Sequence, residues 1–297
     1  MKKQFDVGVD ICGVPWKNRI AAASGTYNFR ESSRYYDPAE IGCITTKGVS
    51  PEPWAGNETP KVAETPGGML NAIGLANRGL KGYLSHDLKP LKDAGATVMA
   101  NVVGHTTEEY CAVAEGLADS DVDLLELNIS CPNVKEGGIA FGTDPRTAAA
   151  LVREVKKRSG RKPVLVKLSP NVTSITDIAK AVCDAGADGL SLINTLIGMR
   201  IDLKTGEPVL ANGTGGLSGP AIHPVAIRMV YEVRKALPSI PIIGMGGVMT
   251  GADAYEFLLA GADAVAVGTA ALLDPAAPPR IARELETILF DNRANGV

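Results

Sequence analysis

The chain has 297 residues, of which 45% are hydrophobic and 21% charged, and its formal net charge is −3 at pH 7. These values are typical of a globular protein that is long enough to bury a large apolar core. They argue against a general binder of nucleic acid, because such proteins usually carry a basic stripe, and this sequence has none. No apolar run approaches the roughly 20 residues that a membrane span needs. No apolar stretch follows Lys2 and Lys3, so we expect no secretory signal.

Short β-branched runs alternate along the chain with stretches of helical period. In chain order, the runs that predict strands are Arg19–Ala23, Cys43–Val49, Thr97–Val103, Leu124–Ser130, Val164–Ser169, Gly189–Thr195, Ile242–Val248 and Ala264–Thr269. The stretches that most clearly predict helices are Thr147–Arg158, Ile175–Ala185, Val225–Ala236 and Ala252–Ala260. Gly95, Gly186 and Gly261 lie in small-residue turns before the next strand, where a left-handed glycine commonly closes a helix.

This alternation predicts an α/β fold with a parallel sheet. Eight strand–helix units in a chain of this size favour a closed (β/α)₈ TIM barrel. An open doubly wound sheet remains an alternative, because strand order cannot be read from a sequence. Two segments rich in glycine, Ser50–Gly79 and Gly198–Pro224, are expected to be long irregular insertions after the carboxyl ends of strands, where barrel enzymes build their sites. No low-complexity linker divides the chain, and we expect one domain over residues 1–297.

The strand Leu124–Ser130 carries polar residues on one face. Side chains alternate along a strand, so Glu126, Asn128 and Ser130 should point into the barrel and the leucines toward the helices. Glu126 is read more readily as a hydrogen-bonded interior carboxylate than as a functional group. Asn128 differs from Glu126, because it lies at the mouth of the barrel.

Cys131 follows this strand directly and precedes Pro132, which places it on a loop at the predicted mouth. A thiolate there could remove a proton or act as a nucleophile. A nucleophile usually needs a nearby histidine, and none of the three histidines lies at a strand end, so proton abstraction is favoured. The other four cysteines are read as inert core residues. The five are scattered without a C-x-x-C pair, which fits reduced thiols in a cytoplasm better than disulfides or an iron–sulfur site.

Two lysines and two glycine runs lie at other strand ends. Lys47 and Lys167 occur in apolar parallel strands, which are normally buried, so their ammonium groups need anionic partners. The runs Ile242–Val248 and Ala266–Ala270 end the seventh and eighth strands, where backbone amides of barrels commonly bind phosphate. No G-x-G-x-x-G, Walker A or metal-binding motif accompanies them, and no catalytic metal is expected.

Together these residues resemble the dihydroorotate dehydrogenase family, and within it the class 1B catalytic subunits. The stretches that carry the resemblance are Thr45–Gly48, Asn71–Leu75, Asn128–Val134, Val166–Asn171, Ile193–Thr195, Gly215–Pro220 and the two glycine runs. The chain departs from the family pattern at Ala76 and Arg78, where glutamine and proline are expected, and this affects only the local loop shape.

The resemblance implies an FMN enzyme that oxidises dihydroorotate to orotate in pyrimidine (UMP) biosynthesis. Cys131 would take the C5 proton, and the C6 hydride would pass to N5 of FMN. The implied substrate-binding residues are Lys47, Asn71, Ala72, Ile73, Gly74, Leu75, Asn128, Asn133, Asn194 and Thr195. The implied FMN-binding residues are Ser24, Lys47, Gly48, Asn101, Asn128, Lys167, Ile193, Gly219, Gly246, Gly247, Gly268 and Thr269.

The class 1B resemblance also implies partners. Electrons would pass to NAD through a second subunit that carries FAD and an iron–sulfur cluster, on a homodimeric core that makes a heterotetramer. Class 2 relatives use serine as the base and carry an amino-terminal membrane-associating extension, and neither is expected here.

Three other readings remain. Another FMN barrel, of the dihydropyrimidine dehydrogenase kind, would share Cys131 and the lysines. A phosphate-binding aldolase or isomerase could use Lys167 as a Schiff base. A non-enzymatic scaffold is disfavoured by the buried lysines and asparagines at strand ends.

Overall fold

A closed barrel of eight parallel strands forms the centre of the computed structural model, which describes residues 5–130 and 138–294. Its strands, in their order around the barrel, are β3 (Ile20–Ala22), β4 (Cys43–Thr45), β7 (Val98–Val102), β8 (Leu124–Asn128), β9 (Val164–Lys167), β10 (Gly189–Leu192), β13 (Ile242–Met245) and β14 (Ala264–Val267). β14 pairs with β3 and closes the ring. The predicted TIM barrel is therefore confirmed, and the open sheet is excluded.

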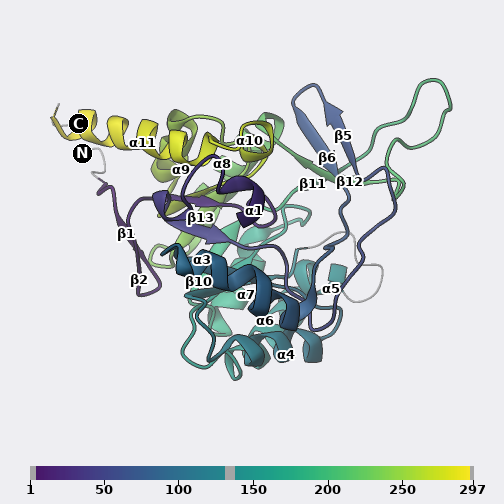
Figure 1. Cartoon of the computed structure of the whole chain (residues 1–297), viewed down its shortest axis with the longest axis horizontal. Helices are drawn as coiled ribbons and strands as arrows, with labels where there is room; N and C mark the ends of the chain where they lie inside the picture. The colour runs from purple at the N-terminus through teal and green to yellow at the C-terminus, as the bar shows by residue number, and fades with distance from the viewer. Residues whose placement is uncertain (1–4, 131–137, 295–297) are drawn as a thin grey trace.

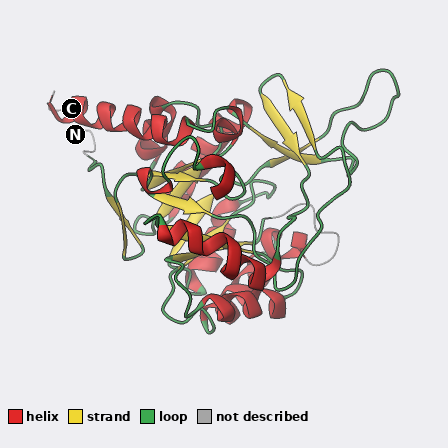
Figure 2. Cartoon of the chain, viewed as in Figure 1, coloured by secondary structure: helices red, strands yellow, loops and turns green. Residues whose placement is uncertain are grey.

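Helices cover the outside of this barrel (Figures 1 and 2). They are α1 (Phe29–Ser32), α2 (Gly79–Gly82), α3 (Lys89–Asp93), α4 (Thr107–Leu117), α5 (Gly138–Thr143), α6 (Pro145–Lys156), α7 (Ile175–Asp184), α8 (His223–Ala236), α9 (Gly251–Ala260), α10 (Thr269–Leu273) and α11 (Ala277–Ala294). Shorter turns are the 3₁₀ segments Pro38–Glu40 and Pro220–Ile222 and the π-helical segment Tyr83–Leu88. Within the described residues, none of the helices combines the length and the apolar character that crossing a membrane requires.

The helix boundaries follow from local capping. The four predicted helices are present as α6, α7, α8 and α9, with ends within two residues of those expected. α6 begins earlier than predicted because Asp144 caps it, accepting a hydrogen bond from the amide of Thr147 at 2.8 Å. The three predicted left-handed glycines have positive φ: Gly95 at 75°, Gly186 at 103° and Gly261 at 116°.

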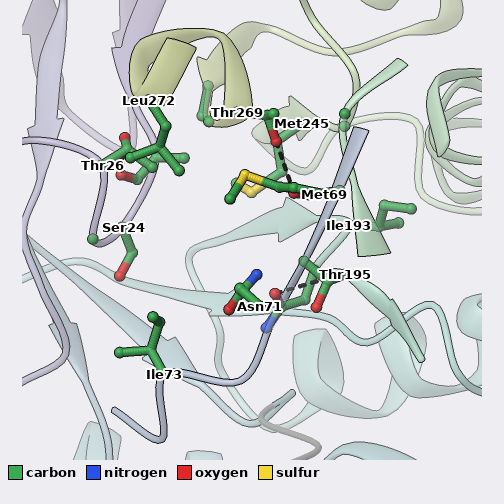
Figure 3. Close-up of a pocket in the computed structure, with 18 of the residues that line it drawn as sticks. Ser24, Thr26, Met69, Asn71, Ile73, Ile193, Thr195, Met245, Thr269 and Leu272 are labelled. Atoms are coloured by element: carbon green, nitrogen blue, oxygen red, sulfur yellow. Dashed lines mark hydrogen bonds between the residues drawn. The ribbon is translucent and has the colours of Figure 1, made fainter. Parts of the chain in front are cut away.

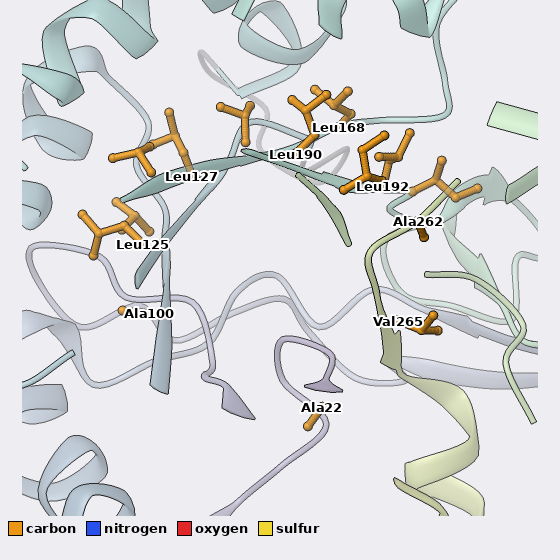
Figure 4. Packing of buried hydrophobic residues seen from close by; sticks show 14 of the residues in the cluster. Ala22, Ala100, Leu125, Leu127, Leu168, Leu190, Leu192, Ala262 and Val265 are labelled. Carbon is orange, nitrogen blue, oxygen red and sulfur yellow. The ribbon is translucent and has the colours of Figure 1, made fainter. Parts of the chain in front are cut away.

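Apolar side chains fill two layers of the barrel. Leu125 and Leu127 point outward from β8 (Figure 4), and with Ile129 they pack in the main core between strands and helices, as the alternation predicts. A second cluster fills the barrel interior and includes Leu124 and Trp16. Trp16 belongs to an unpredicted hairpin, β1 (Val9–Ile11) with β2 (Val14–Trp16), that packs against this interior cluster.

The two predicted insertions join in one sheet. They were expected to be irregular, and this was wrong in part, because they contain β5 (Val62–Thr65), β6 (Gly68–Asn71) and β12 (Gly215–Ser218). With β11 (Leu196–Gly198) these strands form an antiparallel sheet in the order β11–β12–β6–β5. The sheet lies beside the barrel in Figure 1, and residues 199–214 connect β11 to β12. We call it the insertion sheet.

Candidate active site

A cavity of about 450 Å³ opens between the carboxyl ends of the barrel strands and the insertion sheet (Figure 3). Its lining includes most of the residues implied by the resemblance: Ser24, Lys47, Gly48, Asn71, Ile73, Gly74, Leu75, Asn128, Lys167, Ile193, Asn194, Thr195, Gly219, Gly246, Gly247, Gly268 and Thr269. The cavity thus gathers segments that are far apart in the sequence. Its size falls within the usual range for ligand pockets, roughly 300 to 1,000 Å³.

Four of the implied residues are not seen in this lining. Cys131 and Asn133 lie outside the described residues. Ala72 is buried beside Leu70 and Leu210, away from the cavity. Asn101 is fully buried one layer deeper, in the barrel interior.

Polar groups inside the barrel form a connected network around Glu126. The Glu126 carboxylate accepts a hydrogen bond from Asn101 Nδ2 at 2.5 Å and another from Ser191 Oγ at 2.7 Å. Lys167 Nζ lies 3.9 Å from Glu126 Oε2. The reading of Glu126 as a hydrogen-bonded interior carboxylate is therefore confirmed. Glu126 thus supplies the anionic partner that the buried position of Lys167 requires.

Ser130 links two of the asparagines at the mouth, a role that the sequence analysis did not assign. Its Oγ donates to Asn128 Oδ1 at 2.9 Å and lies 2.7 Å from Asn194 Nδ2, which donates to it. Asn194 Oδ1 in turn accepts from the amide of Thr195 at 2.9 Å. The alternation along β8 already placed Ser130 on the same face as Asn128, and this was the signal that could have identified it. These bonds fix the side-chain amides of Asn128, in the segment that leads to Cys131, and of Asn194, which follows β10.

Lys47 lies at the cavity without a carboxylate partner among the described residues. Burial lowers the pKa of Lys47 from the usual lysine value, and the positive charge of Lys61 lowers it further. An anionic group in the cavity would relieve both effects, because an opposite charge favours the ammonium form. The cavity is thus suited to ligands that carry or develop negative charge.

The turns that follow β13 and β14 present free backbone amides. Gly246 and Gly247 have φ values of 137° and 70°, and the amides of Gly246, Gly247 and Gly268 donate no hydrogen bond within the described part of the chain. His223 Nδ1 lies 3.0 Å from the carbonyl oxygen of Gly246, which supports this turn from behind. Thr269 Oγ1 donates to Ser218 Oγ at 2.7 Å and ties the second turn to the insertion sheet. Free amides at adjoining turns form a concave site that suits a phosphate group.

The segment Asn71–Leu75 forms the opposite wall. Gly74 has a φ of 75°, and a Cβ atom there would lie 2.5 Å from the amide nitrogen of Asn57. Asn57 holds the segment by two bonds, from its amide to Ile73 O at 3.1 Å and from Nδ2 to Ala72 O at 3.0 Å. Leu75 also adopts a left-handed conformation, with φ at 55°. The wall therefore has a specific shape that only glycine permits at position 74.

FMN fits the groups that this cavity offers. The free amides suit its phosphate, while Lys47 and Lys167 suit the negative charge that a flavin ring acquires on reduction. Several lining residues were not predicted, namely Ala23, Gly25, Thr26, Val62, Met69, Ser218, Ile222, Met245, Ala266 and Leu272. Many of these are apolar, which suits the flat faces of an aromatic ring system. Ser218, Met245 and Ala266 lie within the stretches that carry the resemblance, and no motif named above marks the others.

Comparison with known proteins identifies the family. The family model described as dihydroorotate dehydrogenase matches residues 7–289. A protein of Geobacillus kaustophilus is 57% identical over 287 residues, covering 96% of this chain and 91% of the relative. Proteins of Geobacter sp. strain M21 and Listeria innocua are 55% and 57% identical, covering 98% and 94% of this chain and 96% and 92% of their own lengths. Each of the three is named "Dihydroorotate dehydrogenase B (NAD(+)), catalytic subunit". The chain belongs to the dihydroorotate dehydrogenase family.

Proposed function

We propose that this chain oxidises dihydroorotate to orotate in pyrimidine biosynthesis, with FMN bound in the cavity. The observation that carries the proposal is the convergence of two lysines, three asparagines and the free amides of two glycine turns on one cavity. The family match over residues 7–289 and the names of the relatives support it.

The substrate would lie between the segment Asn71–Leu75 and the ends of β8 and β10. Asn71, Asn128 and Asn194 each carry an amide that can both donate and accept, as the pyrimidine ring and its carboxylate require. Their orientations are set before binding by Ser130, by Thr195 and by the bond from Asn71 Nδ2 to Gly216 O at 3.4 Å. Preorganised amides lower the cost of orienting the substrate.

The Cys131 thiolate is proposed as the base that takes the C5 proton onto its Sγ atom. Bound FMN supplies the acceptor for the hydride that leaves C6. Lys47 and Lys167 would stabilise the negative charge that accumulates at the ring as that hydride arrives. Lys47 would contact the substrate as well, because its side chain lines the same cavity.

Reduced FMN must pass its electrons on. We propose a partner subunit with FAD and an iron–sulfur cluster that delivers them to NAD, in a heterotetramer built on a homodimer of this chain. The names of the relatives, which include "catalytic subunit" and "NAD(+)", support a partner. Leu272 lines the cavity and is 53% exposed, and Leu273 beside it is 69% exposed. We assign this exposed apolar pair at the cavity rim to the electron-transfer subunit, since electron transfer requires a close approach to the flavin.

We also propose that residues 1–297 form one FMN-binding domain in the cytoplasm. The barrel uses strands from residue 20 to residue 267, and both insertions contribute residues to the cavity at its mouth, which supports a single unit. The described cysteines Cys12, Cys43, Cys111 and Cys183 are all unpaired, which supports a reducing compartment.

The visible spectrum of the purified protein tests the function. A flavin spectrum that bleaches anaerobically on addition of dihydroorotate is the expected result. Dihydrouracil is the matched control, because it lacks the carboxylate. Bleaching by dihydrouracil instead would assign the chain to the other pyrimidine-reducing barrels, and a colourless protein would favour a phosphate-binding barrel without redox chemistry.

A further inference from the structure

Glu126 is a buried charge to which the proposed reaction gives no role. It lies in the middle of β8 with no exposed surface. Its two oxygens are held from two sides, since Asn101 donates from the neighbouring strand β7 and Ser191 from β10 across the barrel interior. A carboxylate in such a position is costly unless a positive charge accompanies it.

The accompanying charge is Lys167. Its side chain is 7% exposed and that of Glu126 is 1% exposed, and their charged atoms are 3.9 Å apart. Among the ion pairs of the described residues, this is the one in which both side chains are less than one-tenth exposed. Lys167 pairs in register with Asn128, one polar position closer to the mouth than Glu126. The lysine thus borders the cavity while the carboxylate lies beneath it.

This arrangement has an electrostatic consequence for the cavity. A buried ammonium group next to a ligand favours negative charge on that ligand, and a carboxylate behind the ammonium opposes this effect. The interaction is strong because water does not screen the pair. The strength with which Lys167 favours a negative charge therefore depends on Glu126.

We propose that Glu126 is a positioning residue that offsets the charge of Lys167 and thereby limits how strongly the cavity stabilises reduced, anionic FMN. The inference rests on the proposed function, in that FMN is the group next to Lys167. It gives Glu126 a role in setting the balance between flavin reduction by substrate and electron release to the next acceptor.

The test uses Glu126→Gln in the FMN-loaded protein. Glutamine has the same shape, and it can accept from Asn101 and donate to Ser191 Oγ, so the packing is kept while the charge is removed. The bound flavin is equilibrated anaerobically with a reference redox dye. The equilibrium constant for electron exchange between the dye and the flavin is measured. The expected result is a shift of at least about tenfold toward reduced flavin relative to the parent protein.

Ser191→Ala is the matched control, because it removes a hydrogen bond from the same carboxylate and leaves the charge in place. A purely structural role predicts similar effects for both variants. The charge role predicts a shift in Glu126→Gln of at least about tenfold and a shift in Ser191→Ala of less than about twofold. An unchanged constant in Glu126→Gln, or a shift toward oxidised flavin, would overturn the proposal.

Two further results, a variant that does not fold and a parent protein without FMN, also have a defined meaning. If Glu126→Gln does not fold, Glu126→Asp is measured instead, since it draws the charge back from Lys167 and should shift the constant in the same direction by at least about twofold. No shift in that variant refutes the role of Glu126. A parent protein that binds no FMN refutes the proposed function itself, whereas an FMN-loaded protein with an unchanged dye equilibrium refutes only this inference.

Discussion

Replacing Gly74 by alanine tests whether the wall formed by Asn71–Leu75 must keep its shape for substrate binding. Gly74 has a φ of 75°, which costs a non-glycine residue about 1 to 2 kcal/mol. The added Cβ atom would lie 2.5 Å from Asn57 N and 2.6 Å from Asn57 Cγ and Oδ1, so Asn57 must move. Its movement breaks the bonds to Ile73 O and Ala72 O, each worth about 0.5 to 1.5 kcal/mol.

Gly206→Ala is the control for this variant. Gly206 has a φ of 77°, but nothing lies within 4 Å of the position its Cβ would take. Both variants bear the same backbone cost, so their difference isolates the displaced Asn57 and amounts to about 1 to 3 kcal/mol. If the wall binds substrate, the KM for dihydroorotate should rise by about 5- to 150-fold in Gly74→Ala relative to Gly206→Ala.

The assay is anaerobic flavin bleaching at varied dihydroorotate concentration, with FMN content and Tm measured in parallel. FMN content should stay equal in the two variants, because the free amides lie on the other side of the cavity. An equal KM in Gly74→Ala and Gly206→Ala would refute the assignment of this wall to the substrate.

Three other outcomes are expected. Cys131→Ser should slow flavin reduction by dihydroorotate by about 10²- to 10⁴-fold while FMN stays bound, and unchanged stopped-flow rates at neutral pH would remove Cys131 from the role of base. Lys167→Ala should weaken FMN retention or slow its reduction, and full retention after gel filtration together with normal kinetics would contradict that placement. Because burial lowers the pKa of Lys47 before substrate binds, kcat/KM for dihydroorotate should decline as the pH rises toward 10.5, the ordinary lysine value, as the Lys47 ammonium group loses its proton. Lys47→Arg should move this decline to higher pH. Overlapping pH–rate profiles for the parent protein and Lys47→Arg would argue against Lys47 as the group that loses its proton.

The barrel strands were predictable from sequence because strands buried on both faces are continuous apolar, β-branched runs. The runs overshoot the strands for a physical reason. Ile193 and Asn194 lie beyond the end of β10 but still donate backbone hydrogen bonds to Met245 O and Leu168 O, and together with Thr195 they line the cavity. The residues by which the predicted run exceeds β10 therefore belong to the candidate site.

The insertion sheet could not be predicted in the same way. Gly215 and Gly216 begin β12, and glycine is a poor strand former. The strand exists because it pairs with β6, whose Asn71 lies opposite Gly216, and such long-range pairing leaves no local pattern. The same holds for the hydrogen bonds of Glu126, whose partners Asn101 and Ser191 come from other strands, and for the bond from Asn194 to Ser130.

The insertion sheet has a consequence for how such a site can be altered. Asn71 and Gly216, which are hydrogen-bonded, lie 145 positions apart in the chain, so neither insertion can form the insertion sheet alone. A graft that transplants only one insertion onto another barrel would bring β6 or β12 without the strand with which it pairs. Exchanging substrate preference between barrels of this design therefore requires moving both loops as a matched set.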